Sequence, residues 1–256
     1  MRSRMPKIIL ALLAGLAIAQ IATLATTVYL HRALTHRALT VRRPLAFSFR
    51  VVTWLTTGLK PREWVAVHRK HHAFADTPED PHSPKVLGWL RVQVTNAALY
   101  RRCARNPDTV ARYAKDLPPD RWDRWVFDRA FLGLGIGIAA LIVLFGPVYG
   151  LIAAVVHTIS YLAIGGSVNG IAHHFGRRPY DNSATNLQWL AFFTWGEGLH
   201  NNHHAAPTSA RFSLHKREID IGWWSVALFR SLGLAKVRLD EVKLLPSATA
   251  AQRRSA

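Results

Sequence analysis

Apolar residues in this 256-residue chain gather into long blocks with polar stretches between them. The first block runs from Lys7 to Leu30 and carries no charge after Lys7, and two more cover 131–145 and 148–168. A helix needs about 20 apolar residues to cross a bilayer. The pattern therefore predicts membrane spans over about 7–30, 127–146 and 148–170, and Gly146-Pro147 between the last two is typical of a hairpin turn.

The ends of the chain and its polar stretches complete the pattern. The basic head from Met1 to Lys7 is similar to the start of a signal peptide, but the apolar stretch behind it is too long for one, so we interpret it as a retained span. A polar stretch from Lys60 to Arg124 is divided into short pieces by the prolines at 78, 81, 84, 107, 118 and 119. The basic C-terminal tail, rich in Ala and Ser, is typical of disorder. The glycines at 133, 135 and 137 indicate close helix packing.

Composition agrees with a membrane protein. Half of the residues are hydrophobic, yet the formal net charge is +18, which indicates apolar spans with a large basic face on one side. A single cysteine excludes an intramolecular disulfide and a thiolate metal cluster. The charge is not concentrated in a DNA-binding motif, so we expect no nucleic-acid partner.

Thirteen histidines are clustered into motifs beside the apolar blocks. His31 and His36 form H-x-x-x-x-H directly after the first span. On a helix, positions i, i+3 and i+4 share one face, so each H-x-x-H-H motif is predicted to present three imidazoles to a common point. The two H-x-x-H-H motifs are His68-Arg-Lys-His71-His72 and His200-Asn-Asn-His203-His204. Between them, at the end of the last span, lies an N-x-x-x-H motif, Asn169-Gly-Ile-Ala-His173. Nine imidazoles exceed the needs of one metal, which indicates two metal ions of a kind that suits nitrogen ligands, namely iron, zinc or copper.

These motifs, with the strings around them, resemble the membrane fatty acid desaturases, in particular the acyl-CoA (stearoyl-CoA-like) branch. The similarity runs from about Val28 to Leu234. The strings that carry it are His31-Arg-Ala-Leu-Thr-His36, Glu63-Trp64-Val-Ala-Val-His68-Arg-Lys-His71-His72, Asp80-Pro81-His82-Ser83-Pro84, Asn169-Gly-Ile-Ala-His173, Phe175-Gly-Arg177-Arg178-Pro-Tyr-Asp181 and Gly196-Glu197-Gly-Leu-His200-Asn-Asn-His203-His204.

The resemblance implies a fold, a reaction and a ligand set. It implies one all-α integral membrane domain over 1–256, with a cytosolic helical cap that holds two iron ions (Fe²⁺), and an O2-dependent enzyme that inserts a cis double bond into a saturated acyl chain. Acyl-CoA is the expected substrate and delta-9 the expected position. The implied metal ligands are His31, His36, His68, His71, His72, His173, His200, His203 and His204, with Asn169 reaching a metal through water.

Six further residues are candidates for supporting roles. We expect His82 to support a metal ligand without binding metal. Glu197 either orients a ligand imidazole or is a turn residue. Trp64 either lines the acyl channel or anchors at the interface. Arg177 and Arg178 are candidates for holding phosphates of acyl-CoA or of lipid headgroups. His157, in the middle of a span, is expected to hydrogen-bond between helices, because a buried polar group needs a partner.

A single metal cluster constrains the topology. All histidine motifs must lie on one side of the membrane, so the apolar segment at 44–59, which contains Arg50, is predicted to be an interfacial helix. Residues 60–125 and 171–256 then lie on the same side. The positive-inside bias makes that side cytoplasmic, here the cytoplasmic face of a bacterial inner membrane. The resemblance implies two spans before the first motif where the sequence has room for one, so either this is a three-span variant or the start misses a span.

Electrons must come from another protein, because the chain has no nicotinamide, flavin or iron–sulfur motif. We expect a ferredoxin or rubredoxin with its reductase, attracted by the basic face. The nearest alternative is a di-iron acyl or lipid hydroxylase on the same scaffold. A zinc transporter would place its histidines within the spans, whereas most of these lie at span ends or beyond.

Overall fold

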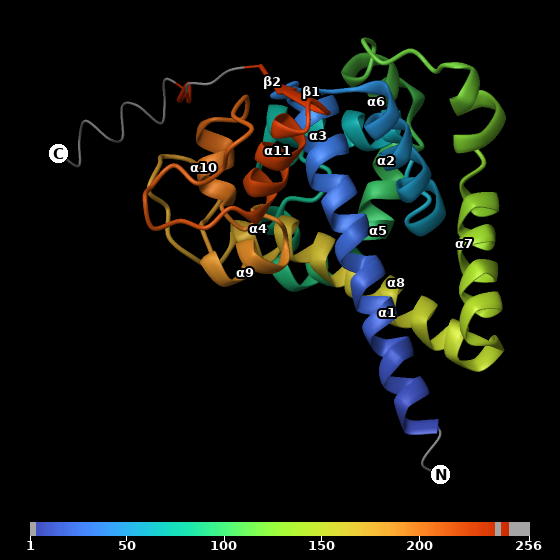
Figure 1. The fold of residues 1–256 in the computed structure, drawn as a ribbon. Helices are drawn as coiled ribbons and strands as arrows, with labels where there is room; N and C mark the ends of the chain where they lie inside the picture. The colour runs from blue at the N-terminus through green and yellow to red at the C-terminus, as the bar shows by residue number, and fades with distance from the viewer. Residues whose placement is uncertain (1–3, 239–241, 246–256) are drawn as a thin grey trace.

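The computed structural model describes residues 4–238 and 242–245, and within them the fold is built from helices, with one short sheet at its edge (Figure 1). Strands β1 (Leu39–Val41) and β2 (Ala235–Val237) pair antiparallel, with Leu39 opposite Val237. The predicted disorder of the tail concerns mainly residues 246–256, which lie outside the described residues, as do residues 1–3 of the basic head. The helices are α1 (Arg4–Ala25), η1 (Thr26–Thr35), α2 (Arg43–Thr56), α3 (Pro61–Phe74), α4 (Pro84–Leu87), α5 (Trp89–Ala104), α6 (Pro107–Tyr113), η2 (Asp123–Phe127), α7 (Ala130–Phe145), α8 (Pro147–Asn169), η3 (Ile171–His173), α9 (Gln188–Phe193), α10 (His200–Ala205) and α11 (Ile221–Ser231).

Proline sets the start of many of these helices. The proline ring lacks an N–H and holds φ near the helical value, so it fits the first turn, where that N–H has no helical partner. The prolines of the polar stretch therefore separate helices, as the sequence suggested. Helices with proline in this position are α2, α3, α4, α6 and α8.

The predicted spans exist as helices, with different limits. α1 continues without a break into the π-helical η1, so the first apolar helix extends from Met5 to Thr35 instead of ending at Leu30. Pro147–His173 is the second helix with the length and composition to cross a membrane. The predicted span at 127–146 corresponds to α7, which begins only at Ala130 and has 16 residues. At 1.5 Å per residue, α7 rises about 24 Å.

Glycines let the helices approach closely. A Cβ added at Gly15 of α1 would lie 2.6 Å from the carbonyl oxygen of Ala153 on α8. On α7, a Cβ at Gly133 or Gly137 would lie 2.5 or 2.3 Å from a backbone oxygen of α2, whereas Gly135 faces open space. Two of the three glycines in this run are therefore needed where α7 meets α2, because helix axes come this close only where a side chain is missing.

Helix α2 also joins the second half of the hairpin. The Nε2 of His157 donates a hydrogen bond to the carbonyl oxygen of Thr56, 2.7 Å away, which confirms the expected inter-helix bond. At the other face, Arg50 pairs with Asp120 and Asp123 at 2.6–3.0 Å. These contacts hold α2 against the top of the hairpin. Its predicted interfacial position stays a prediction.

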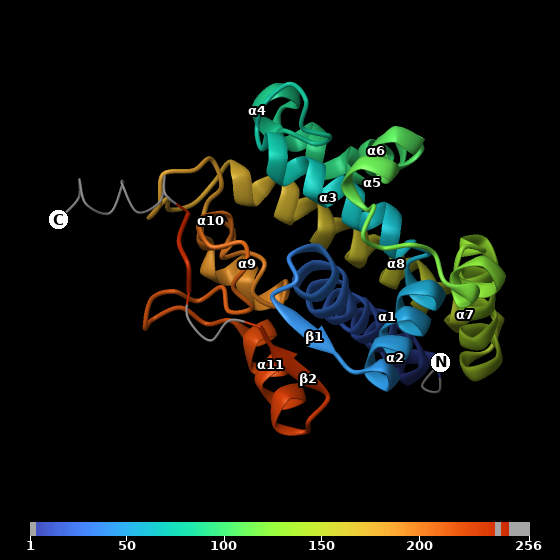
Figure 2. The ribbon, with the colours of Figure 1, turned by 90° about the horizontal axis from the view of Figure 1, so that it is seen from above.

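The remaining helices form a cap at one end of α1. Seen from above (Figure 2), α3 and α10 approach the end of the first apolar helix from different sides. Arg32, fully buried just beyond α1, connects this helix to the C-terminal part of the chain. Its guanidinium donates to the Asp220 carboxylate at 3.1 Å and to the carbonyl of Ala210 at 2.9 Å, and it lies 3.7 Å from the centre of the Phe212 ring.

Candidate metal centre

The π-helical turn brings the first two motif histidines together. In an α-helix, residues five apart point about 140° away from each other, because each residue turns about 100°. In η1 the hydrogen bonds run from residue i to i+5, and the N–H of His36 donates to the carbonyl of His31 at 3.1 Å. The His31 and His36 rings are consequently only 4.8 Å apart, centre to centre. The H-x-x-x-x-H spacing thus matches the local helix geometry.

The two H-x-x-H-H motifs do not present three imidazoles to one point, and that prediction was wrong. On α3, His68 and His72 point to one group of histidines while His71 points to another. On α10, His200 and His204 share a group and His203 leaves it. The reason is angular: positions i+3 and i+4 lie about 100° apart around a helix, while i and i+4 differ by only about 40°.

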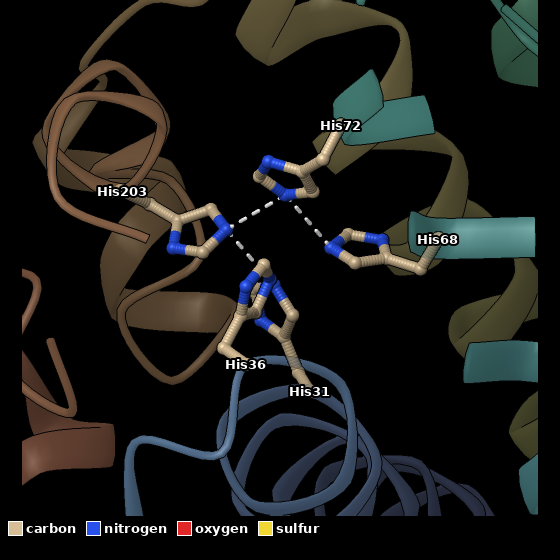
Figure 3. Close-up of side chains that lie close together, drawn as sticks. All are labelled: His31, His36, His68, His72 and His203. Atoms are coloured by element: carbon tan, nitrogen blue, oxygen red, sulfur yellow. Dashed lines mark hydrogen bonds between the residues drawn. The ribbon is translucent and has the colours of Figure 1, made fainter. Parts of the chain in front are cut away.

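The histidines therefore form two groups, each drawn from several elements. The first combines η1, α3 and α10, and Figure 3 shows its five rings pointing toward one another. The second combines α3, η3 and α10. Within each group the ring nitrogens all lie within 4.8 Å of one another. The members are His31, His36, His68, His72 and His203 in the first group, and His71, His173, His200 and His204 in the second.

Ring nitrogens face each other at distances that a shared ion explains. In the first group, His203 Nε2 lies 3.1 Å from His31 Nε2 and 3.0 Å from His72 Nε2. In the second, His204 Nε2 lies 3.3 Å from His71 Nε2 and 3.2 Å from His200 Nε2. Two nitrogens bound to one ion at ~2.1 Å and at right angles are ~3 Å apart. The buried Nε2 atoms of His36 and His173 have no protein partner.

The histidines are held in the form that binds metal. Burial first, and then the charges of neighbouring histidines, lower the pKa of His68, His72, His200, His203 and His204 well below the usual value. These imidazoles are therefore neutral at physiological pH. Neutral nitrogens facing one another at about 3 Å either share a proton or, when both lone pairs are free, attract a cation between them. With Nδ1 protonated, the ring nitrogens of each group are free to bind, so the residues fit two bound metal ions.

Three carboxylates lie behind the ring nitrogens. His31 Nδ1 lies 2.7 Å from Glu197 Oε1, and the side chains of Asp80 and Asp76 lie 2.9 Å from His71 Nδ1 and His173 Nδ1. Burial would raise the pKa of Asp80, but the hydrogen bond and the charge of His71 outweigh it and lower that pKa to about 2. An ionised carboxylate keeps the proton on Nδ1 and leaves Nε2 free for metal.

Comparison with known proteins identifies this arrangement. The model for the fatty acid desaturase family matches residues 7–218, most of the chain. The chain belongs to the fatty acid desaturase family. Fatty acid desaturases of this kind are integral membrane, all-α proteins, and the enzyme is an oxidoreductase that acts on fatty acyl chains.

Three relatives cover most of the desaturase. An "sn-1 stearoyl-lipid 9-desaturase" of Synechocystis sp. is 30% identical over 241 residues, covering 89% of this chain and 70% of its own. An "sn-2 palmitoyl-lipid 9-desaturase" of Nostoc sp. is 35% identical over 216 residues, covering 80% of this chain and 73% of its own. An "Acyl-CoA C20 Delta5-desaturase" of Anemone leveillei is 34% identical over 219 residues, covering 82% and 67%. Fatty acyl desaturation is common to these names.

The other candidate residues of the desaturase lie at different distances from the histidines. The ring of His82 stacks on His71 with centres 4.6 Å apart, and neither of its buried nitrogens has a protein partner. Trp64 stacks on His68 at 4.9 Å. Asn169 donates its side-chain N–H to Asn96 Oδ1 at 2.9 Å. Arg177 and Arg178 are exposed, and Arg178 donates to the carbonyl of Ser183 at 3.2 Å.

Sequence reasoning missed two of the carboxylates. Asp80 stood in the string that resembles the family, but it was given no role, and Asp76 was not singled out. Both follow the second histidine motif within a few positions, and this was the available signal. Which histidine each one meets was not visible, because Asp76 reaches across to His173 on a different element.

One cavity adjoins the centre, and no histidine is among the described residues that line a second one. A cavity of about 340 Å³ is lined by His36, His72 and His204, together with Arg69 and Asn182. His36 and His72 are the histidines of the two groups that are only half-buried. A second cavity, of about 670 Å³, extends from Tyr29 and Leu34 to a polar lining of both signs, with the cations Lys60, Arg62 and Arg105 beside several carboxylates. Solvent therefore reaches the histidines at the first cavity.

Proposed function

We propose that this desaturase introduces a cis double bond at the delta-9 position of a saturated acyl chain, with two iron ions held by the nine histidines. The observation that carries the proposal is the division of the nine imidazoles into two adjoining groups with neutral, mutually facing nitrogens. When bound, iron supplies the O2 chemistry that removes hydrogen from unactivated methylenes, which no side chain can do. Asn169, four residues before His173, is proposed to act through water.

The protein's own residues prepare the site. Glu197, Asp80 and Asp76 orient His31, His71 and His173 through Nδ1, and His82 supports His71 by stacking. Trp64, packed on His68, is proposed to border the acyl chain. Holding the acyl chain in one position beside the metals determines which of its carbons react, because a carbon that is fixed close to the reactive group reacts faster.

The acyl carrier is proposed to be coenzyme A. Lys60, Arg62 and Arg105 line the larger cavity and are candidates for meeting the phosphates, although the same lining carries Glu63 and four aspartates. Arg177 and Arg178 are further candidates for phosphate binding. The second candidate carrier is a membrane lipid, which is favoured by the words "stearoyl-lipid" and "palmitoyl-lipid" in the names of the Synechocystis and Nostoc relatives.

The reductant and the location complete the proposal. A separate acidic carrier, such as ferredoxin or rubredoxin with its reductase, is proposed to deliver two electrons at the basic face of this +18 chain. The histidines would then lie on the cytoplasmic side of a bacterial inner membrane. The positive-inside bias of the sequence supports that orientation.

Product analysis tests the reaction. Total fatty acids of a host that expresses the chain are compared by gas chromatography–mass spectrometry with those of a His71→Ala control. A new monounsaturated acid, lighter by two hydrogens than its precursor and absent in the control, is expected, and its fragments give the bond position. A hydroxy acid would instead indicate the hydroxylase. In purified vesicles, conversion of acyl-CoA but not of phospholipid would support the CoA carrier, and the reverse would reject it.

A further inference from the structure

The apolar helices of this desaturase expose side chains to their surroundings over lengths shorter than the thickness of a bilayer's hydrocarbon core. We call the exposed length of each helix its bare stretch. On α1, exposed apolar side chains begin at Met5 and end at Ile21, after which no residue is exposed until Arg37. At 1.5 Å per residue, that stretch rises about 25 Å. On α8 the exposed stretch ends at Ala163, also about 25 Å from Pro147, and all of α7 rises about 24 Å. A hydrocarbon core is about 30 Å thick.

Exposed apolar side chains of the cap occur where each bare stretch ends. Beside α1, the carbonyl of Phe193 accepts from Gln20 Nε2 at 3.3 Å, and the indole of Trp195 donates to Gln20 Oε1 at 2.8 Å. Phe192 and Phe193 on α9 are each 55% exposed. The end of α9 is thereby fixed at the level of Gln20 and Ile21, where α1 enters the cap.

The same arrangement occurs at the other two helices. Beside α8, Gln93 Nε2 donates to the carbonyl of Ala163 at 3.0 Å, and the neighbouring Val94 of α5 is 72% exposed. Just before α7, Trp125 of η2 is 70% exposed. Each of these exposed apolar segments of the cap therefore lies near the residue at which the bare stretch of the neighbouring helix ends.

We propose that these segments form an apolar collar that sits in the bilayer, so that the cap is partly sunk into lipid instead of standing in water. The apolar collar comprises Leu90, Val94, Trp122, Trp125, Phe192 and Phe193. It supplies the missing ~5 Å of hydrocarbon-facing surface beyond the bare helices. Tryptophan is also the residue that favours the boundary between hydrocarbon and headgroups.

Lipid is the occupant that the contacts favour. The collar is continuous with the exposed faces of the membrane helices, and on α1 the exposed residues are all apolar from Ile8 to Ile21. In Figure 1 the lower end of α1 projects below the other helices. It extends beside three separate helices, as lipid does. The alternative, in which the bilayer thins to match the bare helices, would leave the collar in water at the cost of its exposed apolar area.

The collar bears on the reaction because of where α9 lies. Phe193 is followed within one turn and a short loop by α10, which carries His200, His203 and His204. His31 lies about 15 Å beyond Ile21 along the same helix. A collar in the bilayer thus holds the histidines just outside the hydrocarbon. This inference does not depend on the proposed regiochemistry or acyl carrier.

Spin labels at single cysteines test the collar. Cys103 is the only cysteine of the chain, so Cys103→Ser gives a background for Phe193→Cys, Val94→Cys and Trp125→Cys. Each replaced side chain is more than half exposed, so little buried contact is lost. Matched references are Leu13→Cys on the bare part of α1 and Lys216→Cys on the exposed loop before α11.

The full-length labelled proteins are reconstituted into vesicles of dioleoyl phosphatidylcholine. Collisional relaxation of each nitroxide is measured with O2, which enriches in lipid, and with chromium oxalate, which stays in water. The ratio of the two at 193, 94 and 125 is expected to match that at 13 and to exceed that at 216 severalfold. Ratios that match the one at 216 would overturn the proposal in favour of a thinned bilayer. Spin–spin broadening at 193 that disappears on dilution with unlabelled protein would overturn it in favour of a second copy.

Discussion

Replacing Asp80 by asparagine removes the negative charge of the side chain and keeps its size and shape. Asp80 is fully buried, and Oδ2 accepts from His71 Nδ1 and from the backbone N–H of Asp76, both at 2.9 Å, while Oδ1 accepts from the N–H of His82 at 3.0 Å. Its pKa of about 2 compares with ~3.9 in an unfolded chain, which corresponds to about 2–3 kcal/mol of favourable interaction with the carboxylate.

Asparagine cannot satisfy all three donors. In either orientation its NH2 group faces at least one N–H, and the negative charge that makes His71 a stronger ligand is lost. Loss of such a carboxylate partner weakens metal binding by ~10–100-fold, or about 1.4–2.7 kcal/mol. We therefore expect the iron affinity of Asp80→Asn to fall within that range.

The measurement is an anaerobic competition between the metal-free desaturase and a ferrous chelator, with bound iron per chain determined at each chelator concentration. Glu79→Gln is the matched control, because Glu79 is the exposed neighbour of Asp80 in sequence and touches no histidine in the described contacts. An affinity of Asp80→Asn within twofold of the parent, in a protein that melts at the parent temperature, would show that Asp80 does not control His71.

Three further predictions concern stability, measured as the melting temperature (Tm) in detergent. Gly137→Ala is expected to lower the free energy of unfolding by about 1–3 kcal/mol, because the added Cβ meets the backbone of α2. The control Gly135→Ala faces open space and should not change that free energy. Equal Tm values of the two variants would contradict the packing of α7 on α2. Arg32→Ala is expected to cost about 3–5 kcal/mol and to lower Tm by ~6–20 °C, because it leaves buried carboxylates unpaired, whereas exposed Arg37→Ala should change Tm little. Finally, the metal-free protein should melt at lower temperature at pH 5.5 than at pH 7.5. In the folded protein the clustered histidines stay neutral because their pKa values are lowered, whereas the histidines of the unfolded chain bind protons below pH ~6.5. The free energy of unfolding therefore falls by up to ~1.4 kcal/mol per histidine for each pH unit below that value. An unchanged Tm would contradict this reasoning.

Local chemistry explains how much of this desaturase was readable from its sequence. Long apolar runs in a bilayer can satisfy their backbone only as helices, so α1, α8 and the shorter α7 were predictable as helices, with errors confined to their ends. The end at Thr35 was missed because η1 mixes apolar and polar residues, so no apolar run marks where the helix ends. His157 was predictable as an inter-helix donor because a buried imidazole needs a partner.

The sequence by itself also named the nine histidines that the structure gathers, since their spacing and number are a property of the chain. Tertiary structure alone decided how they divide. His68 and His71 are close in sequence yet belong to different groups, because α3 lies between η1 on one side and η3 on the other, and each helix face takes the partner it meets. The carboxylates Asp76 and Asp80, the buried Arg32 and the apolar collar were decided in the same way. Each depends on which distant segment lies alongside, and that information is held in the packing of the helices and not in any local pattern.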